Sequence, residues 1–152
     1  MKKIILALML VLVLCGTAFG AGSCVVTTNE KVAVESSTQR VYLTLTCMGD
    51  GSITAFSLNP ATYGIRGWYL YNVTTDPGAN APTADYDITL VVGGEDVAAS
   101  RLANRSATAT ETVVISDSTK GYPMMDGIMS ITFANQTANP SEIVMTLRFT
   151  AN

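Results

Sequence analysis

Hydrophobic side chains recur at every second position in three stretches of this chain, and this spacing constrains the fold more than any other feature. In VYLTLTC, at 41–47, Val, Leu, Leu and Cys alternate with Tyr and Thr. The same alternation runs through DYDITLVV at 85–92 and EIVMTLRFT at 142–150. A period of two is typical of strands that bury one side and expose the other. The sequence therefore predicts antiparallel β-structure.

Weaker candidate strands, rich in Thr, Val, Ile and aromatic residues, lie at 52–58, 67–73, 106–115 and 127–133. Turn-forming residues separate them, as at Asp76-Pro77-Gly78 and Gly93-Gly94. The segment at 95–107 is compatible with at most one helical turn. About eight strands with short connections predict an all-β fold, a single antiparallel β-sandwich or jelly-roll-like domain.

The first residues are typical of a secretory signal peptide rather than of a domain. Two lysines precede an unbroken apolar run at 4–14, and small residues at 18–20 follow it. We therefore expect residues 1–21 to be removed and residues 22–152 to form the exported domain, in the periplasm or outside the cell. The apolar run is shorter than the roughly 20 residues that span a bilayer, so no stable membrane insertion is expected after removal of the leader.

The cysteines indicate a disulfide in an oxidising compartment. Once the leader is removed, Cys24 and Cys47 are the two that remain, and an even pair in an exported protein is first interpreted as a disulfide. A structural zinc site is a poorer interpretation, because two thiolates without any histidine lack suitable further ligands. Lipid attachment at Cys15 or Cys24 is an alternative, although the residues before each cysteine fit a lipoprotein signal poorly.

Charge and composition exclude several classes of function. Twelve acidic residues against nine basic ones give a net charge of −3, and the cations are scattered, so nucleic-acid binding is not expected. The chain contains no histidine, which removes the commonest general base and metal ligand. We predict no catalytic residue, no cofactor and no enzymatic activity.

The acidic segment between 76 and 87 is a candidate metal or catalytic site. Asp76, Asn80, Asp85 and Asp87 carry oxygen ligands of the kind calcium prefers, but their spacing lacks the pattern of a preorganised calcium loop. Asp85 and Asp87 are two residues apart on a predicted strand, on the side that faces solvent, so we interpret them as a solvated strand face rather than as a catalytic pair. The segment is predicted to be a connection between strands, with weak calcium binding left open and no metal site assigned.

Aromatic residues gather in YGIRGWYLY, which contains the single tryptophan. Alternation places Trp68 and Leu70 on one side and Tyr69 and Tyr71 on the other, so one set faces the core and the other an exposed surface. Trp68, Tyr69 and Tyr71 are therefore the candidate interface or ligand residues. An exposed aromatic face binds either a protein partner or a sugar ring.

From Gly67 onward the sequence resembles a known group of proteins. The segments GWYLYNVTTDPGANAPTADYDITL, LANRSATATETV and MMDGIMSITFANQTANPSEIVMTLRF resemble small β-rich proteins encoded among the virion structural genes of tailed bacteriophages and prophages. The resemblance implies a non-enzymatic particle component, a capsid decoration or tail-associated protein, which would place the chain on a virion surface. We therefore expect a structural or interaction domain with protein partners or self-association, and a carbohydrate-binding module as the alternative.

Overall fold

The computed structural model of the protein describes residues 22–35, 38–115 and 122–151. Within these residues the strands are β1 (Ser23–Glu35), β2 (Thr38–Gly49), β3 (Phe56–Leu58), β4 (Tyr69–Asp76), β5 (Asp87–Val92), β6 (Glu95–Asp96), β7 (Glu111–Val114), β8 (Met129–Ala134) and β9 (Ser141–Thr150). In this described part, no helix is long and apolar enough to cross a membrane. The predicted leader at 1–21, with Cys15, lies outside the described residues.

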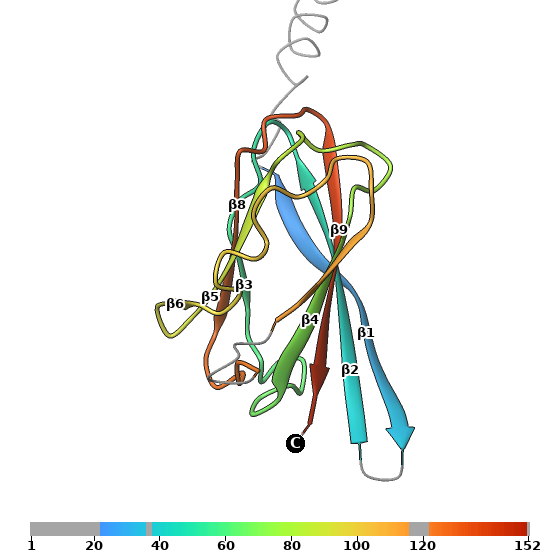
Figure 1. Ribbon diagram of the computed structural model, residues 1–152, viewed down its shortest axis with the longest axis vertical. Helices are drawn as coiled ribbons and strands as arrows, with labels where there is room; N and C mark the ends of the chain where they lie inside the picture. The colour runs from blue at the N-terminus through green and yellow to red at the C-terminus, as the bar shows by residue number, and fades with distance from the viewer. Residues whose placement is uncertain (1–21, 36–37, 116–121, 152) are drawn as a thin grey trace, which may run out of the picture.

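The strands form two antiparallel sheets that face each other (Figure 1). One sheet has five strands in the order β1-β2-β9-β4-β7, and the other has four in the order β3-β8-β5-β6. After β2 the chain passes repeatedly from one sheet to the other. The prediction of an all-β sandwich is confirmed, with one strand more than the eight expected.

The core lies between the sheets and is built from the alternate residues of the predicted strands. In β2, Val41, Leu43 and Leu45 are fully buried, and in β9 every second residue from Ile143 to Phe149 is also fully buried. Burying one such side chain stabilises the fold by about 1.5–3 kcal/mol. β9 lies between β2 and β4, so the last strand of the chain completes the five-stranded sheet.

β1 is a long strand that the alternation rule did not predict. It pairs antiparallel with β2, and its register shifts between Val26 and Thr28. This β-bulge breaks the period of two in the sequence. After the bulge, Asn29 and Lys31 lie opposite buried residues of β2 but are themselves exposed, so this half of β1 lacks the apolar alternation of a half-buried strand.

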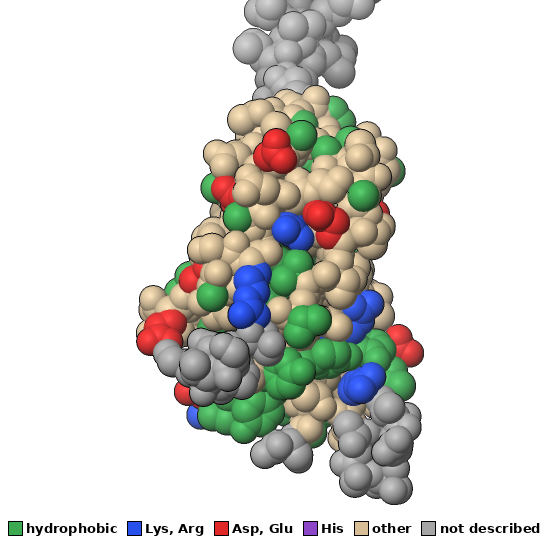
Figure 2. Space-filling model, viewed as in Figure 1, with side chains coloured by type: hydrophobic (Ala, Val, Ile, Leu, Met, Phe, Trp, Pro, Cys, Tyr) green, Lys and Arg blue, Asp and Glu red, His purple; other side chains and the backbone are tan. Residues whose placement is uncertain are grey.

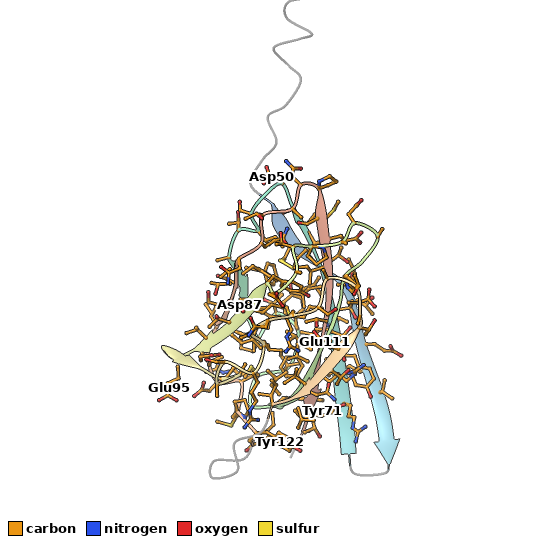
Figure 3. The ribbon with its side chains drawn as sticks, turned by 45° about the horizontal axis from the view of Figure 1, so that its top comes forward. Asp50, Tyr71, Asp87, Glu95, Glu111 and Tyr122 are labelled. Atoms are coloured by element: carbon orange, nitrogen blue, oxygen red, sulfur yellow. A yellow bond between two sulfur atoms is a disulfide. The ribbon has the colours of Figure 1, made fainter. Side chains whose placement is uncertain are left out.

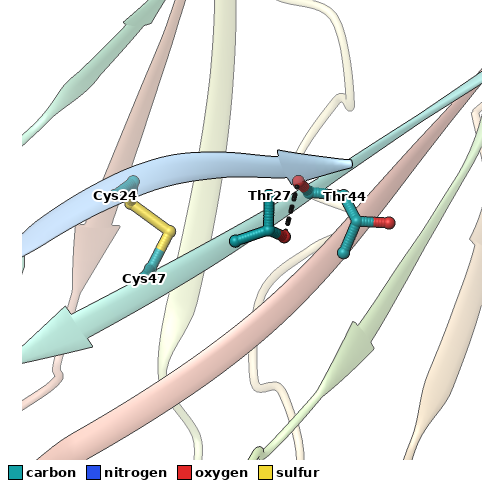
Figure 4. The surroundings of a disulfide bond; sticks show 4 residues. All are labelled: Cys24, Thr27, Thr44 and Cys47. Atoms are coloured by element: carbon teal, nitrogen blue, oxygen red, sulfur yellow. Dashed lines mark hydrogen bonds between the residues drawn. A yellow bond between two sulfur atoms is a disulfide. The ribbon is translucent and has the colours of Figure 1, made fainter. Parts of the chain in front are cut away.

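The predicted disulfide between Cys24 and Cys47 is present and joins β1 to β2 (Figure 4). The two cysteines are direct cross-strand partners, and nearby the Thr27 hydroxyl donates a hydrogen bond to the Thr44 carbonyl oxygen at 3.2 Å. The cysteines are 23 residues apart in the sequence, and closing a loop of that length stabilises a fold by about 3 kcal/mol in the chain-entropy model. Because the disulfide uses the Cys24 thiol, lipid attachment at this residue does not fit the structure.

Two local expectations need correction. The candidate strand at 52–58 is reduced to β3, which has three residues. Asp85 precedes β5 in a turn with a φ of 59°, so Asp85 and Asp87 do not share a strand face. A left-handed residue cannot continue the extended strand, and this ends the regular alternation at Asp85. The segment at 95–107 contains the short β6 and a series of tight turns.

Candidate functional site

Five side chains form a continuous surface on the outer face of the five-stranded sheet. We call it the arginine–tyrosine surface, and it consists of Arg40, Tyr42, Tyr71, Tyr122 and Arg148. The Arg40 guanidinium lies over the Tyr71 ring, 5.3 Å from its centroid, and that of Arg148 lies 5.7 Å from the Tyr42 centroid. Tyr122 meets Tyr71 edge-on, with ring centroids 6.5 Å apart. In Figure 3 these two tyrosines lie at the end of the molecule opposite Asp50.

Strand register brings distant parts of the chain together in this surface. Tyr42 of β2 is the direct cross-strand partner of Arg148 of β9, and Arg148 in turn faces Asn72 of β4. Arg40 lies two residues before Tyr42 and therefore on the same face. The alternation that buries Val41 and Leu147 thus exposes this set on the other side.

A second β-bulge places Tyr71 in the surface. The pairing of β4 with β9 shifts register between Leu70 and Asn72, and Tyr71 is the extra residue. Leu70 and Val73 both remain fully buried, while Tyr71 and Asn72 are both partly exposed. Strict alternation would have put Val73 on the same side as Tyr71. Bulges redirect side chains in this way at many binding surfaces.

Backbone pairing holds the segment that carries Tyr122 beside the start of β4. The Leu70 amide donates to the Pro123 carbonyl at 3.0 Å, and the Met125 amide donates to the Trp68 carbonyl at 2.7 Å. Tyr122 and Met124 are 43% and 45% exposed, respectively, which is high for side chains of their size. Figure 2 shows hydrophobic side chains gathered in the lower part of the view, with Lys and Arg side chains beside them.

Hydrogen bonds fix the orientation of Arg148 within the surface. Its Nη1 donates to Asn72 Oδ1 at 3.0 Å and to Thr74 Oγ1 at 2.6 Å. Each guanidinium–ring contact contributes about 0.5–1 kcal/mol at an exposed site. Burial, followed by the hydrogen bond and charge of Tyr42, raises the pKa of Tyr71, while the two arginines act in the opposite direction. The raised pKa keeps the Tyr71 ring neutral, and the two arginines give the surface a positive charge.

The three aromatic residues named from the sequence have different positions. Tyr71 belongs to the arginine–tyrosine surface, whereas Trp68 is partly buried and packs against the core. Tyr69 is half-buried and pairs with Thr150 of β9. Arg40, Tyr42, Tyr122 and Arg148 were not predicted. Their alternation pattern did predict that Tyr42 and Arg148 point outward from two strands. The sequence did not show that these two strands are neighbours in the sheet.

Two of the acidic residues between 76 and 87, Asp76 and Asp87, each accept two hydrogen bonds. Asp76 accepts from the Thr110 hydroxyl and the Gly78 amide, and these bonds lower its pKa. Asp87 accepts from the Asn104 amide at 2.8 Å and from Asn135 Nδ2 at 2.7 Å. Within the described residues no group of three His, Cys, Asp or Glu side chains is placed to hold a metal ion. The stretch connects β4 to β5, as predicted, and so links the two sheets.

An open groove of about 510 Å³ lies between β1 and β3, away from this surface. Residues 24–29, Phe56, Thr62 and Tyr63 line it, and none of them is charged. Because it lacks converging titratable groups, this groove does not resemble a catalytic site.

No family model, curated protein or solved structure matches the chain. The resemblance to phage virion proteins therefore stays a prediction.

Proposed function

We propose that the protein is a non-enzymatic interaction domain that works outside the cytoplasm and binds protein through the arginine–tyrosine surface. One observation carries the proposal: Arg40 and Arg148 stack on two tyrosines across three neighbouring strands of an exposed sheet face. Tyrosine and arginine are enriched among residues that dominate protein–protein binding energy. Their mutual stacking also orders both side chains before binding, which lowers the entropy lost in a complex.

Export is supported by the Cys24–Cys47 disulfide, because such bonds persist in oxidising compartments. The predicted leader at 1–21 leads to the same compartment. The specific form of the proposal is a virion accessory protein, a decoration or tail-associated subunit, and it rests on the resemblance that begins at Gly67. An enzymatic role has little support, since Asp76 and Asp87 accept hydrogen bonds from turn residues and the chain has no histidine.

Particle association tests this proposal. Particles are purified on a density gradient from cells that carry the gene, and mass spectrometry measures the amount of the mature chain in the particle fraction. We expect the wild type to be present and Tyr71→Ala or Arg148→Ala to reduce its amount at least tenfold, as is typical for hot-spot residues. Glu95→Ala, on an exposed residue of the other sheet, is the matched control. Absence of the wild-type chain from particles would contradict the virion role.

Carbohydrate binding is the second candidate, and the exposed ring of Tyr122 is the observation that favours it. The faces of Tyr42 and Tyr71, however, are already stacked against guanidinium groups. A sugar ring would have to displace an arginine from either ring, so the geometry favours a protein partner. Binding on a glycan array that is lost in Tyr122→Ala or Trp68→Ala would reverse this preference.

A further inference from the structure

A row of threonines crosses the whole outer face of the five-stranded sheet. Cross-strand pairing places one threonine on each strand in register, and the threonine row consists of Thr28, Thr44, Thr146, Thr74 and Thr112. Two neighbouring pairs are in hydrogen-bond contact, with 3.2 Å between the hydroxyl oxygens of Thr44 and Thr146 and 2.8 Å between those of Thr74 and Thr112. The row forms an uncharged band of small side chains across the middle of the face.

Opposite charges lie at equal distances on the two sides of this row. Arg148 is two residues from the row along β9, and Asp76 is two residues from it on the other side, along β4. Four residues from the row the pattern repeats, with Arg40 on the side of Arg148 and Glu142 on the side of Asp76. Glu30 of β1 pairs with Tyr42 and therefore lies in the same row as Arg148, at the edge of the sheet. A rotation by 180° about the threonine row would bring Arg148 and Arg40 of one copy toward Asp76 and Glu142 of the other.

We propose that the partner of this face is a second copy of the chain, packed face to face about a twofold axis that runs along the threonine row. The inference rests on the proposed function, because it identifies the protein that the arginine–tyrosine surface binds. In this arrangement Thr146 of the two copies meet at the axis. Arg148 of each copy approaches Asp76 of the other, and Arg40 approaches Glu142 on the adjacent strand.

The face is large enough for a stable dimer. The five strands have four to 13 residues and average about nine, so at about 3.3 Å per residue and about 4.8 Å between strands the face covers about 740 Å². This is about the area that each partner contributes to an ordinary specific interface. Because the axis relates the face to itself, one contact uses it completely, and assembly stops at two copies rather than forming a filament.

Uncharged groups hold three of the charged side chains on the face, Asp76, Glu142 and Arg148, in the contacts described for them. Asp76 and Glu142 accept hydrogen bonds only from uncharged donors among their described partners, namely the Thr110 hydroxyl and the amides of Gly78 and Ala79. Each carboxylate therefore retains its negative charge in those contacts. Arg148 is likewise held by neutral oxygen acceptors of Asn72 and Thr74. In a dimer these charges would be neutralised in pairs, Arg148 with Asp76 and Arg40 with Glu142.

Light scattering coupled to size exclusion, on the disulfide-bonded mature chain, tests the proposal. We expect a dimer that dissociates as salt screens the charges, and at least a tenfold higher dissociation constant for Arg148→Glu. Asp76→Arg should also be monomeric, and mixing these two variants should restore a dimer. Glu95→Lys, on the other sheet, should dimerise like the wild type. A wild type that is monomeric throughout the micromolar range overturns the proposal.

A cross-link tests the axis without depending on Asp76, whose substitution also removes local hydrogen bonds. We expect Thr146→Cys to form a disulfide between copies under mild oxidation, since residue 146 faces itself across the axis. Thr89→Cys, on the outer face of the four-stranded sheet, should stay unlinked. A dimer in which Thr146→Cys does not cross-link would refute this interface. A monomer whose particle binding still depends on Arg148 would refute the second copy while leaving the proposed function intact.

Discussion

The two faces of the five-stranded sheet are built from the same strands but have different roles. The inner face carries fully buried side chains such as Leu43, Leu45 and Leu147. The outer face carries threonines at its centre, with Arg40 and Arg148 beside tyrosines at one end. The comparison indicates that alternate residues of one strand have separate roles. The inward set stabilises the fold, and the outward set is available to contact a partner. Substitutions on the inner face should therefore change folding, and those on the outer face should change binding.

The largest effect is expected for Leu147→Ala. Leu147 is fully buried at the centre of β9, and removing its side-chain atoms leaves a cavity that costs about 3 kcal/mol of unfolding free energy. Urea denaturation measures the loss. The neighbouring Thr146→Ala, on the outer face, is the matched control and should cost less than about 1 kcal/mol. Equal losses for the two variants would contradict the division between the faces.

Removing the disulfide should have the next largest effect. Cys24 on the edge strand β1 and Cys47 on its neighbour β2 are both buried on the inner face of the sheet. The double variant to serine should lose about 3 kcal/mol in the chain-entropy model. Denaturation with and without reductant measures this difference. The reductant should lower the unfolding free energy of the wild type and leave that of the double variant unchanged. Equal unfolding free energies of the wild type with and without reductant would contradict a stabilising disulfide.

Arg148→Ala should separate binding from stability most clearly. The substitution removes two hydrogen bonds and the stacking on Tyr42, which together contribute about 1–2 kcal/mol at a partly exposed site. Partner binding should weaken at least tenfold. Unfolding at low protein concentration measures the loss of stability, and a binding titration measures the loss of affinity for the partner. Arg66→Ala, an exposed arginine outside the surface, should alter neither.

The smallest effect is the pH dependence due to Asp76. Hydrogen bonds from Thr110 and then Gly78 hold its folded pKa below the usual 3.8, so its carboxylate favours folding above that pH. This contribution is lost as the pH falls through the folded pKa. The stability difference between the wild type and Asp76→Asn should therefore be present at neutral pH and disappear in acid. A difference that grows on acidification would show that the carboxylate is not stabilised as described.

The strands that repeat strictly at every second residue were predictable, and β2, β5 and β9 lie where their patterns indicated. β1 was not, because its bulge after Val26 moves Asn29 and Lys31 to the inward side. The alternation from Trp68 to Tyr71 holds, with Leu70 buried and Tyr69 and Tyr71 partly exposed, and the bulge at Tyr71 breaks it only afterwards, so that Val73 rather than Asn72 is buried. A bulge adds one residue to one strand only, and the sequence of that strand does not record its partner's register.

The disulfide was predictable from the number of cysteines and the predicted compartment. The arginine–tyrosine surface was predictable only in Tyr71, because its other members are spread between Arg40 and Arg148. Cross-strand contacts such as Tyr42 with Arg148 depend on β2 and β9 being neighbours. Nothing in either strand alone specifies that neighbour.

The amino-acid sequence by itself determined that this chain forms a β-sandwich, since burying alternate residues of many short strands has few other solutions. It also determined the pairing of Cys24 with Cys47. The tertiary structure decided which strands lie side by side, and through them the arginine–tyrosine surface and the threonine row. The physical reason is that alternation is a local property of each strand, whereas a binding face is formed by register between strands that are far apart in the chain.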